Sequence, residues 1–395
     1  MRAFATVSLL LAASSVGAQP GPHKGNQAIY VLTNNPDNAV IGLPIQKNGL
    51  LGKPIATLTG GVGAAGVDSD GVPAGPDSLF SQGAVTVADE YVFAVNPGDS
   101  TLSQLKVSPH NPSKLTLVGA PIKIPGEFPN TVAATSKGKL VCVGTTGVIS
   151  GVSCTTYSAD GLGELDAIRP FNLGQTTPAT GPRNTLSHVL FSTDGSALYA
   201  TVKGDGTTEN PGFFSVFPVK YGCKLESAAY VSREDIRSSP AGTGLLFGAV
   251  IVPSSGLVFV TDPGFGVSIV EVNSETHTAT SRQNVEIPGQ SATCWAAYSP
   301  KSSSVFVTDV LVNRLVEVDA QTGEILLTAN LPNDDPGLVD LWVVGQHVYA
   351  LSPGNGTTDA AITVFDYAKE KQVQRMSLAE LGAGPSAMGM AYIEI

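Results

Sequence analysis

"LSHVLFSTDGSALYATVKGDG", residues 186–206, reads as a β-strand, a tight turn, a second β-strand and a glycine-rich loop. Turn residues such as Asp-Gly between two runs of apolar, β-branched and aromatic residues are typical of a β-hairpin. The first strand also carries His188. If similar hairpins recur along the chain, this hairpin is a structural repeat and His188 is one position within it.

Strands similar to the second strand of this hairpin do recur. Seven stretches match it: AIYVLTNN (28–35), YVFAVNPG (91–98), LVCVGTTG (140–147), LYATVKGDG (198–206), VFVTDPGFG (258–266), VFVTDVLVN (305–313) and VYALSPGNG (348–356). They lie about 45 to 60 residues apart, which is the spacing of propeller blades. Most of them follow another apolar strand and a turn, as in HVLFSTDGS (188–196), and precede a third strand, as in FFSVFPV (213–219).

The repeats predict an all-β protein, a seven-bladed β-propeller that occupies residues 19–395 as a single domain. The C-terminal stretch AMGMAYIEI (387–395) resembles a first strand with nothing after it, and AIYVLTNN resembles a second strand with nothing before it. We expect the two to pair in one composite blade that closes the ring and removes the exposed sheet edges. DIRSSP (235–240) and SLAEL (377–381) could each form a single helical turn.

The composition limits the classes of function. The chain has 395 residues, of which 44 are Gly, 27 are Pro and 14% are charged, and its net charge is −11. An acidic chain is a poor partner for nucleic acid or for an anionic membrane surface. Residues 1–18 have the layout of a secretory signal peptide cleaved after Ala18, and no later segment is long enough to span a membrane. We therefore expect a protein that is secreted or resident in the lumen of the secretory pathway.

The four cysteines fit an oxidising compartment. Cys142 and Cys154 flank a predicted hairpin loop, so we expect a disulfide between them, whereas Cys223 and Cys294 could form a second bridge or stay free. Asn355 begins an Asn-Gly-Thr sequon and is a candidate glycosylation site. The sequence has no zinc-type cysteine pairs and no GxSxG, HExxH or Walker motif, so we assign no metal ligands and no cofactor, although the scattered aspartates leave room for a calcium in the channel.

The shared opening of the ring is the place where we expect a ligand. Loops that lead into the innermost strands share one face with the loops between second and third strands, and a concave mouth there would collect side chains from all blades. We predict His188, Arg183 and Lys203 as catalytic residues, with the two cations holding a carboxylate or enolate. The predicted substrate-binding residues are Gln82, Glu127, Phe247, Asp262, Phe265, Trp295, Asp309 and Asp340.

Several of these residues have a purely structural alternative. His188 could transfer a proton near pH 7, or its ring could be satisfied by neighbouring backbone. Asp262 and Asp309 occupy the same place in two VFVTD repeats, where aspartates usually cap loops by accepting backbone N–H bonds. Phe247 and Trp295 could stack on a substrate or only pack the channel.

The repeat carrying HVLFSTDGSALYA resembles the lactonase-type seven-bladed propellers, which include bacterial 6-phosphogluconolactonases and the fungal 3-carboxy-cis,cis-muconate lactonising enzyme. PDSLFSQGAV (76–85), TGLLFGA (243–249), TCWAAYSP (293–300) and SPGNGTTDAAITVFD (352–366) are similar to secreted fungal proteins described as carboxymuconate cyclase-like. The resemblance covers essentially the whole chain after the signal peptide. It implies catalysis without metal or cofactor by a histidine at the channel mouth, arginines and a carboxylate.

His188 matches the place of the family's histidine, and Arg183 lies just upstream of it. The place of an arginine after the second strand of a later blade instead reads TDPGFG or TDVLVN. Related secreted fungal propellers are also similar to hetero-Diels–Alder cyclases of tropolone–sesquiterpene pathways, whose reaction needs an apolar pocket and a donor that polarises a carbonyl.

The sequence therefore favours a secreted, cofactor-independent enzyme that forms or opens a ring in a small unsaturated carbonyl metabolite, with lactonase or muconate-cyclase-like chemistry. One alternative is a pericyclase such as a hetero-Diels–Alder cyclase. Another is a non-catalytic secreted binding protein or surface antigen. A deep pocket with convergent polar groups would favour an enzyme, and a plugged channel with a flat rim would favour a binder. The sequence leaves the oligomeric state open.

Overall fold

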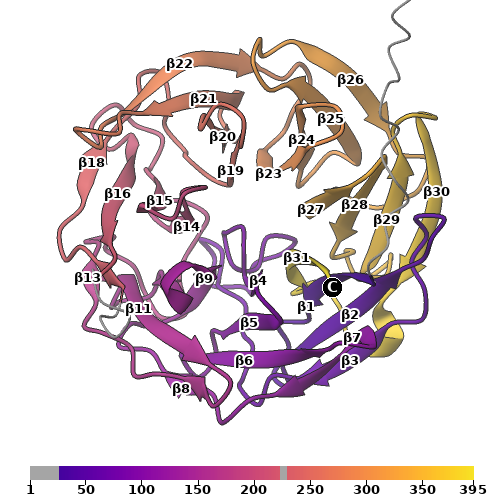
Figure 1. The fold of residues 1–395 in the computed structure, drawn as a ribbon. Coiled ribbons are helices and arrows are strands. Elements are labelled where there is room, and N and C mark those ends of the chain that lie inside the picture. Colours follow the sequence, from indigo (N-terminus) through magenta and orange to yellow (C-terminus); the bar gives the residue numbers. More distant parts are fainter. Residues whose placement is uncertain (1–25, 223–228) are drawn as a thin grey trace, which may run out of the picture.

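The computed structural model describes residues 26–222 and 229–395, and in them seven antiparallel sheets form a closed ring (Figure 1). The protein is a seven-bladed β-propeller, as the repeats predicted. The predicted signal peptide, residues 1–18, lies outside the described residues. In the part of the chain that is described, no helix combines the length and the apolar character that crossing a membrane requires.

Each blade has four main strands, counted outward from the central channel. The first, or inner, strands are β4 (Val85–Ala88), β9 (Pro129–Thr135), β14 (Leu186–Phe191), β19 (Ala249–Ile251), β23 (Thr293–Ser299), β27 (Val339–Val344) and β31 (Met388–Glu394). The second strands are β1 (Gln27–Leu32), β5 (Tyr91–Asn96), β10 (Leu140–Thr145), β15 (Ala197–Lys203), β20 (Val258–Asp262), β24 (Ser304–Asp309) and β28 (His347–Ser352).

The third strands are β2 (Ala39–Ile45), β6 (Thr101–Ser108), β11 (Gly151–Ser158), β16 (Gly212–Lys220), β21 (Gly266–Val272), β25 (Arg314–Asp319) and β29 (Ala361–Asp366). The fourth strands are β3 (Ile55–Leu58), β7 (Asn111–Leu117), β12 (Gly161–Leu162), β17 (Tyr230–Val231), β22 (Ala279–Glu286), β26 (Ile325–Asn330) and β30 (Lys371–Ser377). Three short strands pair with the third strands of their blades. They are β8 (Ile122–Lys123), β13 (Arg169–Pro170) and β18 (Ile236–Ser238).

The burial of the strands follows their distance from the channel. Most second strands are buried along their whole length, because each blade packs against a neighbour on both faces. The outer strand β26 instead alternates half-buried and exposed residues, which is the period-2 pattern of a strand with one solvated face. This gradient explains why the second strands gave the clearest repeat in the sequence.

The ring closes where the sequence predicted. β31 pairs with β1, with Tyr392 opposite Ile29, and the backbones of Asn26 and Ile395 exchange hydrogen bonds of 2.9 and 3.0 Å. The composite blade therefore joins the two ends of the described chain and closes the ring.

The two predicted helical turns had different outcomes. Residues Ala379–Leu381 form a 3₁₀ turn, η2, within SLAEL, which confirms that prediction; the other 3₁₀ turn, η1, is Lys137–Lys139. The prediction for residues 235–240 was wrong. Ile236–Ser238 forms β18 and pairs with residues 214–216 of β16, because a free strand edge satisfies its backbone groups.

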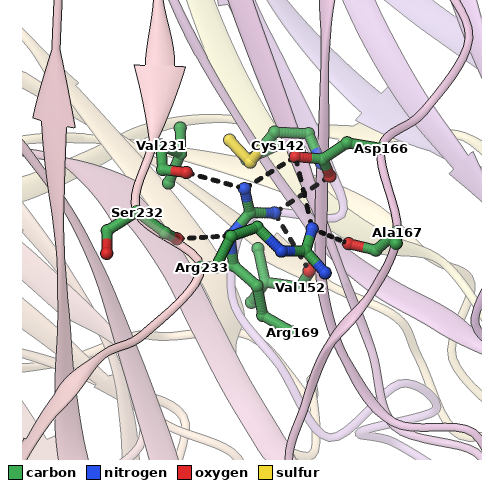
Figure 2. The surroundings of a disulfide bond; sticks show 9 residues. Cys142, Val152, Asp166, Ala167, Arg169, Val231, Ser232 and Arg233 are labelled. Atoms are coloured by element: carbon green, nitrogen blue, oxygen red, sulfur yellow. Dashed lines mark hydrogen bonds and ion pairs between the residues drawn. A yellow bond between two sulfur atoms is a disulfide. The ribbon is translucent and has the colours of Figure 1, made fainter.

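The predicted disulfide between Cys142 and Cys154 is present. The two residues face each other across β10 and β11, with Cα atoms 4.0 Å apart. Beside the bridge, the Asp166 carboxylate accepts a 2.8 Å hydrogen bond from the Cys154 N–H and pairs with the buried guanidinium of Arg169 (Figure 2). Cys294 is buried and free, whereas Cys223 lies outside the described residues.

Replacing both bridged cysteines with alanine should lower the free energy of unfolding by about 3 kcal/mol, because the cross-link restricts the unfolded chain. Urea denaturation of wild type and of the C142A/C154A variant measures the difference. Adding reductant should reproduce the loss in wild type and change nothing in the variant. Equal stabilities of the oxidised wild type and the variant would contradict the prediction.

Candidate functional site

Five inner strands carry an irregularity at the end where the chain enters them. The pairing register shifts by one residue in β9, β14, β23, β27 and β31, and the residues left unpaired are Asn130, Ser187, Cys294, Asp340 and Gly389. An extra residue of this kind, a β-bulge, redirects the local backbone and its side chain. The bulges form a ring around one end of the channel.

The segment Leu79–Gly83, which we call the plug, fills that end of the channel. The carbonyl of Leu79 accepts a 3.1 Å bond from the amide of Asn130, and the carbonyl of Gly83 accepts a 2.8 Å bond from the N–H of Val132. The N–H of Gln82 donates to the carbonyl of Ser187 at 2.9 Å. These partners belong to two other blades, and the plug residues are buried.

Three long side chains, those of Lys203, Trp295 and Gln82, form further hydrogen bonds that hold the plug in place. Lys203 Nζ donates to the Phe80 carbonyl at 2.5 Å and lies 3.9 Å from the centre of the Phe247 ring. Trp295 donates its indole N–H to the Ser81 carbonyl at 3.1 Å. The side-chain amide of Gln82 exchanges two hydrogen bonds with the backbone of Ala296 in β23, as a neighbouring strand would. The plug is therefore bonded to blades around the ring and crosses the channel.

Ionisable groups at the plug have shifted pKa values. Burial raises the pKa of Asp77 to about 6, although the charge of Lys203 opposes this shift, and burial lowers the pKa of Lys203 to about 8. Burial also raises the pKa of Asp340 to about 7, while the backbone N–H groups of Leu341, Met390 and Gly83 stabilise its carboxylate.

On the side of the plug that faces the rest of the inner strands, the channel is open. A cavity of about 610 Å³ extends along the inner strands, with Gln82, Gly83 and His188 among the residues at its closed end. Exposure rises toward the far ends of these strands: Val132, Ala249 and Ala296 are almost fully buried, whereas the turn residues Thr193, Pro253 and Pro300 are exposed. The cavity therefore opens on the face of the turns between first and second strands.

This finding differs from our expectation for the ligand site. The sequence predicted a concave mouth at the opposite face, and the plug closes the channel there. The repeats locate the channel, but they carry no information about the segment before β4, which is the part that closes it. Of the predicted residues, only Gln82 and His188 line the cavity.

The tautomer of His188 is set by the backbone of the next blade. The N–H of Ala249 donates to His188 Nδ1 at 3.2 Å, so Nδ1 holds the lone pair and the neutral ring carries its proton on Nε2. Burial lowers the pKa of His188 to about 4, which keeps the ring neutral at physiological pH. No protein group in the described residues pairs with Nε2, so His188 can offer one N–H to a ligand.

Gly83 makes room for this imidazole. Its φ is +79°, which favours glycine, and a Cβ at this position would come within 2.9 Å of His188 Nε2. The plug therefore borders the histidine without covering it with a side chain.

The remaining cavity wall is apolar and aromatic. None of the described residues that line it is Asp, Glu, Lys or Arg. Phe191, Tyr298, Trp342 and Tyr392 come from four blades, and the rings of Trp342 and Tyr392 stack with centroids 6.1 Å apart. Trp342 is 37% exposed, which places it near the mouth.

Sequence reasoning missed these four aromatic residues. A usable signal existed, because each lies in the second half of an inner-strand motif, as in HVLFS, WAAYS, DLWVV and MAYIE. Alternating residues of a strand point to opposite faces, so the positions that face the channel could have been assigned once the strands were located.

The other predicted site residues lie at the plug or in loops of the closed face. Lys203, Phe247, Trp295 and Asp340 are buried around the plug, and Phe247 packs edge-on against Trp295 with centroids 5.0 Å apart. In the described residues no hydrogen bond or ion pair joins His188 to Arg183 or Lys203. The predicted roles of these residues with a substrate stay predictions. In the structure the side chains of Lys203, Phe247, Trp295 and Asp340 have partners within the protein.

Asp262 and Asp309 use their carboxylates in the same way. Asp262 accepts backbone N–H bonds from Gly244, Leu245 and Gly264. Asp309 accepts them from the corresponding residues of its own blade, Ser291, Ala292 and Leu311. Both contact patterns are those of loop capping.

Three further predicted residues lie in loops. Arg183 is exposed, Phe265 is half-buried in the turn between β20 and β21, and Glu127 accepts a 2.6 Å bond from the Thr177 hydroxyl. Asn355 is exposed between β28 and β29, and its Oδ1 accepts a 2.7 Å bond from Thr357 Oγ1. Its glycosylation stays a prediction.

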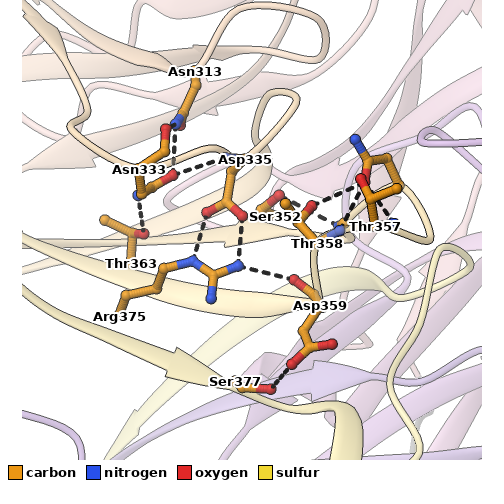
Figure 3. Close-up of polar contacts among 12 residues, drawn as sticks. Asn313, Asn333, Asp335, Ser352, Thr357, Thr358, Asp359, Thr363, Arg375 and Ser377 are labelled. Atoms are coloured by element: carbon orange, nitrogen blue, oxygen red, sulfur yellow. Dashed lines mark hydrogen bonds and ion pairs between the residues drawn. The ribbon is translucent and has the colours of Figure 1, made fainter.

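The polar cluster near Asn355 serves the blade framework. Arg375 forms two hydrogen bonds to the buried carboxylate of Asp335 and a third to the Asp359 carbonyl (Figure 3). Asn333 connects the same region to Asn313 of the preceding blade. These contacts hold the link between two blades, and among the described residues no cluster of metal-ligating side chains exists.

Comparisons with known proteins support the fold. The periplasmic gluconolactonase PpgL of Pseudomonas aeruginosa has a similar structure, with a TM-score of 0.65 and 14% identity over 93% of this chain and 99% of that one. A putative 6-phosphogluconolactonase from Bacteroides fragilis gives 0.61 and 13% over 95% and 100%. AztD from Citrobacter koseri gives 0.54 and 10% over 94% and 98%. At these identities the likeness shows the propeller fold alone.

No family model matches the chain, and no curated protein matches it. The similarity to lactonase-type propellers therefore rests on structure, and the cavity has to be interpreted from its own residues.

Lys203 should behave as an anchor of the plug. Replacing it with methionine removes the bond to the Phe80 carbonyl and leaves Asp77 without its cation. We expect the free energy of unfolding to fall by about 3 kcal/mol, because the variant loses a buried hydrogen bond from a charged group and the nearby cation that favours the Asp77 carboxylate. The D77N/K203M double variant should recover part of this loss, because it leaves no lone charge. Urea denaturation of the four proteins measures the coupling, and an unchanged stability of K203M would refute the anchor role.

Proposed function

We propose that the protein is a cofactor-independent enzyme that forms or opens a ring in a small unsaturated carbonyl compound bound below the plug. The observation that carries this proposal is the neutral imidazole of His188, whose Nε2–H faces the closed end of an apolar cavity. A hydrogen-bond donor at the closed end of a pocket whose lining has no charged side chain fixes where a ligand oxygen lies.

His188 would act by polarising the substrate carbonyl. A donor that already points at the oxygen stabilises negative charge as it develops in the transition state, and it does so most strongly where water is excluded. The cavity wall adds the second contribution, because holding the reacting atoms near each other removes much of the entropic barrier. Neither contribution requires a metal or a charged side chain.

Within this class, the tautomer of His188 favours ring formation. Hydrolytic ring opening needs a base to activate water, but the lone pair of the ring is on Nδ1, where Ala249 donates to it. The described lining residues offer no carboxylate or amine as a substitute. A cyclisation or cycloaddition, of which a hetero-Diels–Alder reaction is an example, needs only orientation and a polarised carbonyl. The lactonase names of two structural neighbours support the ring-opening alternative.

A second candidate function is binding without catalysis. The plug supports it, because the face on which we expected converging polar groups is closed. A binding protein would retain the ligand unchanged, and the experiment below separates the two functions.

We propose that the protein acts outside the reducing cytosol. The disulfide between Cys142 and Cys154 supports this location, because such bridges form and persist in oxidising compartments. The resemblance of residues 1–18 to a secretory signal peptide supports the same location.

Replacing His188 with phenylalanine should lower turnover by about 10² to 10³-fold, the usual cost of removing one donor to a developing oxyanion. Uncharged unsaturated carbonyl compounds are incubated with the enzyme and followed by mass spectrometry. Ring formation conserves the summed mass of the reactants, whereas hydrolytic opening adds one water. His347→Phe is the matched control, because His347 is a half-buried histidine outside the cavity. Equal rates for wild type and H188F, or no turnover of any compound, would contradict the proposal that the protein is an enzyme.

In a D340N background, which removes the carboxyl group whose pKa is raised to about 7, the rate should show no titration of His188 between about pH 6 and 8, because a pKa near 4 leaves His188 uncharged throughout this range. The sign follows from burial, which penalises the imidazolium and therefore lowers the pH at which the ring protonates. A pH–rate profile measures this behaviour. A rate that rises through an inflection near pH 6.5 would indicate a solvated histidine acting as a base and would contradict the assigned role.

A further inference from the structure

We propose that the cavity selects uncharged, ring-containing carbonyl compounds and rejects phosphorylated, carboxylated and polyhydroxylated lactones. This substrate class rests on the proposed function, because it concerns the same cavity.

The lining gives an anion no counter-charge. Among the described residues that border the cavity there is no Lys or Arg, and its one titratable imidazole is neutral at pH 7. Moving a carboxylate or phosphate from water into such surroundings without a paired cation carries a large desolvation cost. An anionic substrate would therefore bind only with its charge left outside the mouth.

The two cations that the sequence predicted for the site are not available to the cavity. Lys203 is 2% exposed, and its ammonium group is already bonded to the Phe80 carbonyl on the plug. Arg183 is exposed in a loop before β14, on the face that the plug closes. Neither residue borders the cavity.

The lining also offers few partners for hydroxyl groups. The Gln82 amide uses its oxygen and one of its two N–H groups on the backbone of Ala296, which leaves one N–H for other partners. Besides His188, the polar side chains on the wall are those of Thr86, Thr193, Tyr298, Trp342 and Tyr392, and Thr193 lies at the exposed mouth. A sugar lactone would leave several hydroxyls without partners, and buried unpaired hydroxyls weaken binding strongly.

The shape and the aromatic residues indicate rings. A cavity of about 610 Å³ is within the usual size range for drug-sized ligands. Four aromatic side chains from four blades border it, and aromatic faces and edges pack well against flat unsaturated groups. The excluded class contains the gluconolactones for which two structural neighbours are named.

Matched probes test the selection on the full-length protein. Coumarin is an uncharged unsaturated lactone, coumarin-3-carboxylate adds one negative charge to it, and glucono-δ-lactone is an uncharged but polyhydroxylated lactone. Calorimetric titration of the wild-type protein compares their dissociation constants. We expect coumarin to bind at least about 10²-fold more tightly than either of the other two.

Two charge-insertion variants sharpen the test. Val250→Lys and Thr86→Lys each place a cation on a half-buried part of the wall, in different blades. In either folded variant the preference should shift by at least about tenfold toward coumarin-3-carboxylate. Circular dichroism shows which variants fold. Two positions are used so that, if one variant does not fold, the other still tests the prediction.

The outcomes separate this proposal from the proposed function. Equal affinities for the three probes, tighter binding of the carboxylate, or no binding of coumarin would overturn the substrate class. If only coumarin binds but H188F retains full turnover, the substrate class holds and the catalytic role fails. If turnover depends on His188 but only a charged substrate reacts, the catalytic role holds and the substrate class fails.

Discussion

Hydrogen bonds between the plug and the entry ends of the inner strands organise the centre of this propeller. A ring of seven blades leaves a channel whose wall presents polar backbone groups at each inner-strand bulge. The side-chain amide of Asn130, the carbonyl of Ser187 and the carboxylate of Asp340 hold Leu79–Gly83 across the channel. Buried backbone groups require partners, so plug and bulges satisfy one another. The same contacts tie blades that are distant along the chain to one segment.

The plug also determines the electrostatics of the channel. It separates Lys203 and Asp77, neither of which borders the cavity, from the cavity that contains His188. The pKa of His188 is lowered because the charged ring would lose solvation at the closed end of the cavity. The Ala249 N–H then fixes which nitrogen keeps the proton. A histidine expected from sequence to transfer protons becomes a neutral donor.

Much of the fold was predictable from local patterns. The second strands, the composite blade and the Cys142–Cys154 bridge all depend on neighbouring residues or on a repeat with a fixed period. Phe247, Trp295 and Lys203 were correctly located near the channel, but their role depended on what filled it. A segment that lies outside the repeat, such as residues 76–84, has no second copy to compare it with. Its position was therefore not predictable from periodicity.

The sequence by itself determined the seven blades, their closure and the presence of His188 on an inner strand, because alternating apolar residues and turn chemistry act over short distances. Only the tertiary structure decided which end of the channel is open, which groups border the cavity and which nitrogen of His188 carries the proton. These properties arise from contacts between blades, such as those of Gln82 with Ala296 and of Ala249 with His188. Residues far apart in the chain come into contact there, and no local sequence pattern predicts these contacts.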